Sequence, residues 1–119
     1  MPETGEIAVK KLWQTIDVGT VVNPSGAMAQ AEGAALWGLS LALREGAEFE
    51  SGQVKQRNLD TYTPLRMADV PELDIVLVDS DAFPSGLGEP PFIPVAPAIG
   101  NAVFAATGQR VRDLPIRLV

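Results

Sequence analysis

Two segments of the chain have patterns of hydrophobic residues that are typical of strands. Residues 6–17 alternate between apolar and polar side chains, with an irregularity at Lys10 and Lys11, and predict a strand. Residues 75–78 are all apolar, so both faces of a strand over 73–80 would be apolar, which favours a buried strand. Residues 46–54 predict a strand end and a turn, and the composition of 56–72 and 84–94 predicts loops. Residues 112–119 predict a short extended end.

Two other segments carry apolar residues at helical spacing. Asn23 followed by Pro24 is a favourable helix start, and the apolar positions that follow predict a helix over 24–45: Met28, Ala31, Ala35, Leu39 and Leu43. A second helix is predicted over 97–107, with Gly108 closing it. Its few polar positions predict a helix covered on several sides.

Three glycines, Gly26, Gly33 and Gly38, lie within the first predicted helix. Each interior glycine costs about 1 kcal/mol relative to alanine. A helix that accepts this cost usually does so because another backbone, or a ligand, approaches it closely.

Composition and charge narrow the class of protein. The 119 residues are 46% hydrophobic and 20% charged, as in an ordinary globular domain, and we expect one domain over 1–119. The predicted fold is α/β (α+β), a small mixed sheet with two main helices. A net charge of −6 without a basic cluster argues against a nucleic-acid partner. The chain has no Cys and no His, which excludes disulfides, thiolate metal sites and His-based catalytic triads.

Two motif-like stretches and the hydropathy pattern exclude further classes. Gly86-x-Gly88 has Pro91 where a dinucleotide-binding loop has its third Gly, and no βαβ unit frames it. Asp79-x-Asp81 lacks the sixth-position Gly and the twelfth-position Glu of a calcium loop. No segment is long and apolar enough to predict a transmembrane span.

Glu89 is the most informative carboxylate, because it stands in a Gly/Pro loop directly before the second predicted helix. It is either a surface carboxylate in a turn, which could accept hydrogen bonds from the helix start, or a general base on a stiff loop. Gly88 would allow a ligand to approach the backbone, and Pro90 and Pro91 restrict the loop.

Several other polar residues are ambiguous. Gln30 is either an exposed helix residue or a side chain with a specific partner among Ala and Gly. Asn101 lies inside the second predicted helix, where Asn is unfavourable without a specific hydrogen bond. Tyr62 and Arg57 are weaker candidates, and Arg57 is more typical of a solvated charge.

Three stretches together resemble one family. They are DVGTVVNPSGAMAQAEGAALWGLSLALRE, RNLDTYTPLRM and GLGEPPFIPVAPAIGNAVFAATGQRVRDLPI, in this order along nearly the whole chain. They resemble the C-terminal segment of the molybdopterin-binding large subunit in the xanthine dehydrogenase/aldehyde oxidase family. The isoquinoline 1-oxidoreductase and membrane-associated aldehyde dehydrogenase branch is the most similar. The GEPP-to-APAI block is the most specific part.

The resemblance implies roles for three residues and a cofactor. Glu89 matches the family's catalytic base, and Gln30 and Gly88 match positions close to the molybdopterin. Ala34 replaces the second Gly of the family's Q-x-E-G-G helix, and Leu87 stands where Val is usual. The chain supplies no metal ligand, because the pterin holds the molybdenum in this family.

The resemblance also implies partners, because family subunits are several times longer than this chain. We expect a fragment of the larger molybdenum-binding domain that works with the remainder of its subunit and with an iron–sulfur subunit. The assembled enzyme would oxidise an aldehyde or an N-heterocycle with molybdopterin, whereas the isolated chain would hold no cofactor and would self-associate. The alternative is a non-catalytic interaction module that keeps the fold.

Overall fold

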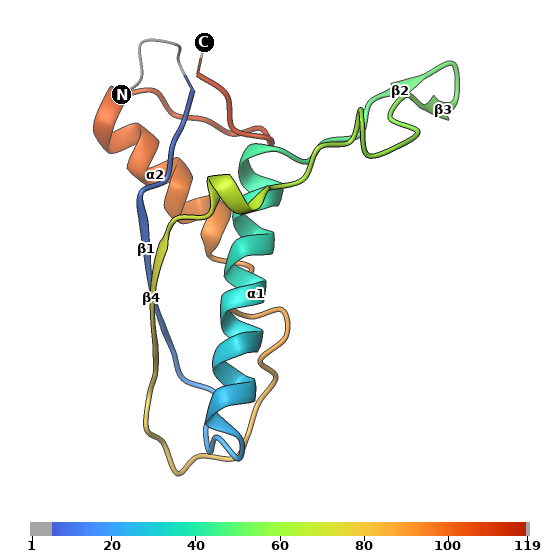
Figure 1. The fold of residues 1–119 in the computed structure, drawn as a ribbon. Coiled ribbons are helices and arrows are strands. Elements are labelled where there is room, and N and C mark those ends of the chain that lie inside the picture. Colours follow the sequence, from blue (N-terminus) through green and yellow to red (C-terminus); the bar gives the residue numbers. More distant parts are fainter. Residues whose placement is uncertain (1–5, 119) are drawn as a thin grey trace.

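The computed structural model describes residues 6–118 as a helical layer against a small sheet, with one protruding hairpin (Figure 1). The elements in chain order are β1 (Lys11–Ile16), α1 (Pro24–Leu43), β2 (Phe49–Glu50), β3 (Gln53–Val54), a 3-10 turn (Met67–Asp69), β4 (Glu72–Leu77) and α2 (Val95–Thr107). The predicted pair of main helices and the small mixed sheets are confirmed.

The strands form one parallel and one antiparallel pair. β1 and β4 pair in parallel, from Lys11 opposite Glu72 to Ile16 opposite Leu77. Parallel strands need a long crossover, and α1 lies within this one. β2 and β3 pair antiparallel with Phe49 opposite Val54, and this hairpin extends away from the helices (Figure 1).

Local sequence signals set the helix ends. Asn23 Oδ1 accepts a hydrogen bond from Gly26 N at 3.1 Å, which caps α1 as predicted. The helix ends at Leu43, before the predicted 45. The Glu45 amide donates to Ser40 O, five residues back, whereas a regular helix would bond it to the carbonyl four residues back. α2 begins at Val95, two residues before the prediction, and ends at Thr107, where Gly108 with a φ of 74° forms the C-cap.

The core lies mainly between the two helices. One cluster of buried side chains joins them to the C-terminal segment: Leu39, Ala42, Val95, Ile99, Val103 and Ile116. A second cluster joins the sheet to the first half of α1 and contains Ile16, Val18 and Ala31. Ala31, Ala35 and Leu39 are at most 1% exposed, which confirms the predicted buried face of α1.

Two burial predictions are wrong for the described part of the chain. β4 alternates between exposed and half-buried positions, and Val76 is 52% exposed, because α1 covers only one face of the strand. α2 buries only Val95, Ile99 and Val103. Its other sides are not covered within residues 6–118.

Candidate active site

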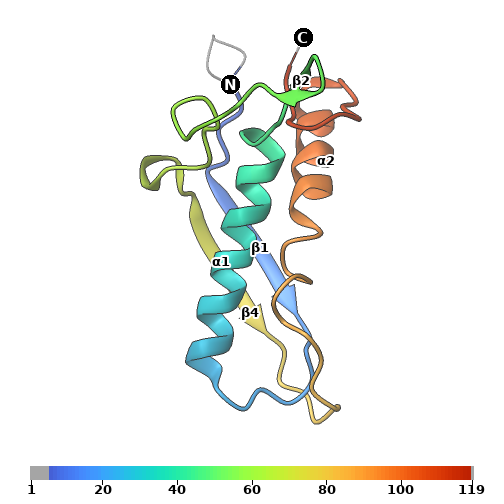
Figure 2. The same cartoon turned by 90° about the vertical axis from the view of Figure 1, so that its right-hand side faces the viewer.

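The loop that carries Glu89 runs alongside α1 before it enters α2 (Figure 2). At one end of this path, a Cβ added to Gly88 would lie 3.8 Å from Gln30 Nε2. At the other end, the rings of Phe92 and Trp37 meet edge to face with centroids 5.7 Å apart. The structure therefore brings Gly88 next to Gln30, two of the residues that the sequence singled out.

The start of this loop is bound to the loop that precedes α1. Thr20 N donates to Ala82 O at 2.9 Å, and Ser85 N donates to Val18 O at 2.8 Å. Gly19 allows these two loops to lie this close together, because it has a φ of 73° and an added Cβ would lie 2.7 Å from Ala82 O. These contacts fix where the chain turns back along α1.

Side chains on both sides of Glu89 hold the rest of the loop. Leu87 packs against the second core cluster, and Pro91 is less than 2% exposed. Gln14 Nε2 on β1 donates to Pro91 O at 2.5 Å. Phe92 N donates to Glu89 O at 2.9 Å and closes a turn. Glu89 is thus an exposed residue between two anchored positions.

Gly38 allows the end of the loop to approach α1 closely. A Cβ at this position would lie 2.8 Å from Phe92 O and 2.9 Å from Val95 Cβ, closer than side-chain atoms tolerate. The close approach expected from the helix glycines is therefore confirmed at Gly38. By contrast, no protein atom lies within 4 Å of the Cβ position of the exposed Gly33.

The Glu89 and Gln30 side chains are both exposed. Neither makes a side-chain hydrogen bond or an ion pair with another residue of 6–118. The start of α2 at Val95 has no side-chain cap, so the Glu89 carboxylate does not cap this helix as the alternative interpretation suggested. Both groups are available to a ligand.

The weaker candidates lie elsewhere or face solvent. Tyr62 donates a hydrogen bond to Glu45, just beyond the end of α1, roughly 22 Å along the helix from Gln30. Arg57 is exposed and donates to Gln53 Oε1 at 2.9 Å. Asn101 is exposed on α2 and lines a shallow cavity of about 340 Å³. None of the three is placed beside Gln30 and Gly88 by these contacts.

Tyr62 gives a prediction for alkaline pH. The hydrogen bond to Glu45 raises the pKa of Tyr62, and partial burial raises it further. The contribution of this bond to stability is complete below the unfolded-state pKa of about 10 and is lost as the pH rises through the folded-state value. Tyr62 is the single tyrosine, so phenolate absorbance reports it alone. We expect a titration midpoint above about 10, and Glu45→Gln should lower it. Equal midpoints would refute the contact.

Gln14 is a residue of the loop support that sequence reasoning missed. It lies on the same face of β1 as Leu12 and Ile16. This face points toward the core, so an apolar residue is expected there. The sequence signal that could have identified Gln14 was a polar residue at a strand position that faces the core. Its Oε1 is buried and has no hydrogen-bond donor within residues 6–118.

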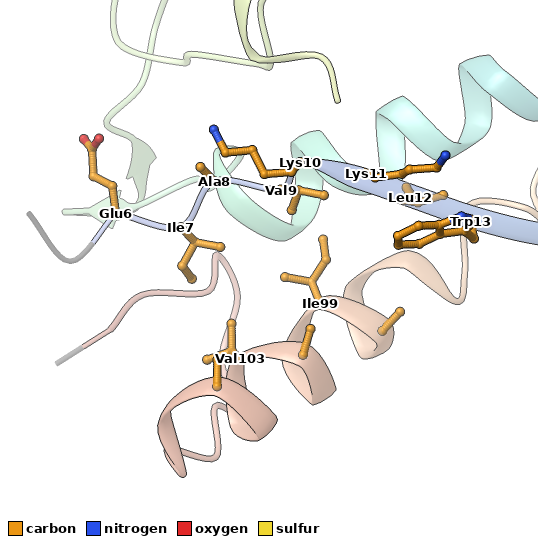
Figure 3. Close-up of a pocket in the computed structure, with 13 residues that line it drawn as sticks. Glu6, Ile7, Ala8, Val9, Lys10, Lys11, Leu12, Trp13, Ile99 and Val103 are labelled. Carbon is orange, nitrogen blue, oxygen red and sulfur yellow. The ribbon is translucent and has the colours of Figure 1, made fainter. Parts of the chain in front are cut away.

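An apolar groove lies apart from the Glu89 loop, between the β1 segment and α2 (Figure 3). Its volume is about 520 Å³. Ile7, Val9 and Trp13 line one side, and Ile99 and Val103 line the other. The groove thus follows the face of α2 that carries the buried Ile99 and Val103, next to the exposed Ala98, Ala102 and Ala106.

Residues 6–118 hold neither a cluster of metal ligands nor a membrane-spanning helix. They contain no group of three or more His, Cys, Asp and Glu side chains placed to hold a metal ion. No helix in this range has the length and apolar character needed to cross a bilayer.

Comparison with solved structures shows where this fold occurs. Quinoline 2-oxidoreductase from Pseudomonas putida 86 matches with a TM-score of 0.82 at 23% identity, over 92% of this chain and 15% of that one. The two-helix arrangement is thus a segment of the fold of a much larger enzyme chain.

Sequence relatives indicate the class of protein. A membrane-bound aldehyde dehydrogenase [pyrroloquinoline-quinone] of Gluconacetobacter polyoxogenes is 55% identical over 96% of this chain. The beta subunit of isoquinoline 1-oxidoreductase of Brevundimonas diminuta is 38% identical over 93%. The chain spans only 15% and 14% of the lengths of these two relatives.

The molybdopterin cofactor-binding domain model matches residues 1–71. The chain belongs to this family and is a segment of a large subunit of the xanthine dehydrogenase/aldehyde oxidase type, as its sequence predicted. The matched range contains Gln30 and all of α1, whereas Gly88 and Glu89 lie beyond it.

The geometry at Gln30 fits a polar cofactor. Gly33 lies one helical turn beyond Gln30 on the same side of α1, and both leave their surroundings open. The Gln30 amide and the Glu89 carboxylate have no ion-pair or hydrogen-bond partner among the residues described. A pterin carries many donors and acceptors, which the amide of Gln30 could meet, and Gly33 leaves space beside it.

Proposed function

We propose that this chain is the base-bearing, C-terminal segment of a molybdenum hydroxylase that oxidises an aldehyde or an N-heterocycle. The match of residues 1–71 to the molybdopterin cofactor-binding family carries the proposal. The substrate class follows the names of the two relatives, an aldehyde dehydrogenase and an isoquinoline oxidoreductase.

Each proposed site residue has a role that its surroundings support. Glu89 is the general base, because an exposed carboxylate without a paired cation is free to accept a proton. Gly88 keeps the backbone beside it open to the cofactor, and Gln30 would bind the cofactor through its amide. Molybdopterin, when bound, supplies the redox centre that receives the electrons of the substrate.

The proposed partners of this chain follow from its short length relative to its relatives. Because the chain spans about one seventh of its relatives, the remainder of the subunit would complete the cofactor pocket, and an iron–sulfur subunit would take the electrons away. The apolar groove beside α2 would be covered in that assembly. The same groove favours the second candidate function, a non-catalytic interaction module.

The cofactor can be tested directly, because the name of one relative points to pyrroloquinoline quinone and the family model points to molybdopterin. We would purify the chain with and without the rest of its subunit, then combine native mass spectrometry with molybdenum and quinone analysis. We expect molybdenum in the active assembly, and a metal-free, self-associating species for the chain alone.

Three results would contradict the proposal in different ways. An active assembly that contains the quinone and no molybdenum would overturn the cofactor. A stable complex with neither cofactor would favour the interaction module. A monodisperse monomer of the chain alone at all concentrations would count against the exposed groove as a contact surface.

A further inference from the structure

Among residues 6–118, Gln14 makes the single side-chain hydrogen bond from β1 to the Glu89 loop. Its Nε2 lies 2.5 Å from Pro91 O, across a sequence separation of 77 residues. The amide must present its nitrogen here, because the reverse orientation would place two oxygen atoms against each other. Gln14 therefore determines how far Pro91 stands from the sheet.

Pro91 transmits this position to Glu89. The Glu89 carbonyl accepts hydrogen bonds from Phe92 N at 2.9 Å and Ile93 N at 3.4 Å, so Glu89 and Pro91 belong to one closed turn. Proline fixes its own φ, and Pro91 is less than 2% exposed. A shift of the Pro91 carbonyl would thus move the backbone of Glu89 as well.

Packing alone does not account for a glutamine at this position. Leu12 and Ile16 occupy the same face of β1, and an apolar side chain at position 14 would continue their pattern. Gln14 Oε1 is buried without a donor among residues 6–118, which is unfavourable for the folded state. The favourable contribution of Gln14 must therefore come from the hydrogen bond that its Nε2 donates to Pro91 O.

We propose that Gln14 is a positioning residue for the proposed catalytic base: its amide sets the Pro91 carbonyl and thereby the direction of the Glu89 carboxylate. This inference rests on the proposed function of Glu89. It adds a residue from β1 to a site otherwise formed by α1 and the loop before α2.

The test is Gln14→Leu in the complete, cofactor-loaded enzyme. We expect kcat to fall by about tenfold or more with KM little changed, because small displacements of a catalytic group are costly. The melting temperature should hold, since the variant removes one buried unpaired oxygen, Gln14 Oε1, and leaves another, Pro91 O. Hydrogen exchange of the Phe92 amide should accelerate. Thr15→Val, at the adjacent exposed position, is the matched control.

The same change in a Glu89→Gln background separates the two proposals. If Gln14 acts through Glu89, Gln14→Leu causes no further loss there. Full activity of Gln14→Leu beside an inactive Glu89→Gln would overturn the positioning role alone. A lower melting temperature with an additive loss would make Gln14 merely structural. Full activity of Glu89→Gln would overturn the proposed base and this inference together.

Discussion

Glu89→Gln is expected to reduce kcat of the assembled enzyme by about 10²–10⁴-fold, the range typical of a lost general base. The substitution keeps the size of the side chain and removes its ability to take up a proton. It should not disturb the fold, because the Glu89 side chain is exposed and the turn uses only its backbone carbonyl. Steady-state kinetics together with molybdenum content would measure both effects.

Two matched variants make this result specific. Asp81→Asn removes one exposed negative charge from the same connection between β4 and α2, and it should leave kcat unchanged. Glu89→Asp keeps the charge but shortens the side chain, so it should give intermediate activity. If Glu89→Gln lost molybdenum along with activity, Glu89 would be structural. Undiminished turnover with full cofactor would exclude it as the base.

The second large effect concerns the stability of the chain and compares two glycines of α1. Gly38→Ala should lower the free energy of unfolding by about 1–3 kcal/mol, because the new Cβ would meet Phe92 O and Val95 within 3 Å. Gly33→Ala should instead raise it by up to about 1 kcal/mol, because alanine favours the helix and nothing lies within 4 Å.

Urea denaturation of the purified chain would test both glycine variants at once. Opposite shifts of the midpoint with an unchanged slope are the expected outcome. Equal shifts in the same direction would mean that helix propensity alone decides, and that the loop does not pack against Gly38 in solution. In the loaded enzyme, reduced cofactor content for Gly33→Ala would further support a ligand near this face.

Local signals in the sequence were sufficient for one end of each helix. Asn23 before Pro24 gave the start of α1, and Gly108 gave the end of α2, because caps depend on residues within a turn of each other. Glycine in a helix also predicted a close approach, and Gly38 confirms it. Gly33 is also a glycine inside the helix, yet no protein neighbour lies within 4 Å of its added Cβ. A helical glycine therefore does not by itself show which group, if any, approaches it.

Features that depend on distant contacts were not predictable in the same way. Ile75 to Val78 satisfy the pattern of a buried strand, yet whether both faces are covered depends on other segments, and α1 reaches only one of them. The resemblance indicated roles for Gln30 and Gly88, but their proximity became visible only in the structure. Gln14 escaped notice because its partner is a backbone carbonyl 77 residues away.

The distance in sequence between the Glu89 loop and its supports affects how the chain is made. Thr20 bonds Ala82 across 62 residues, and Gln14 bonds Pro91 across 77. During translation, β1 and α1 must therefore leave the ribosome long before the segments that complete them. Closing such long loops slows folding, and apolar surface stays exposed in the meantime. The nascent chain is thus open to chaperones or to aggregation until α2 and Ile116, which complete the main core cluster, have emerged.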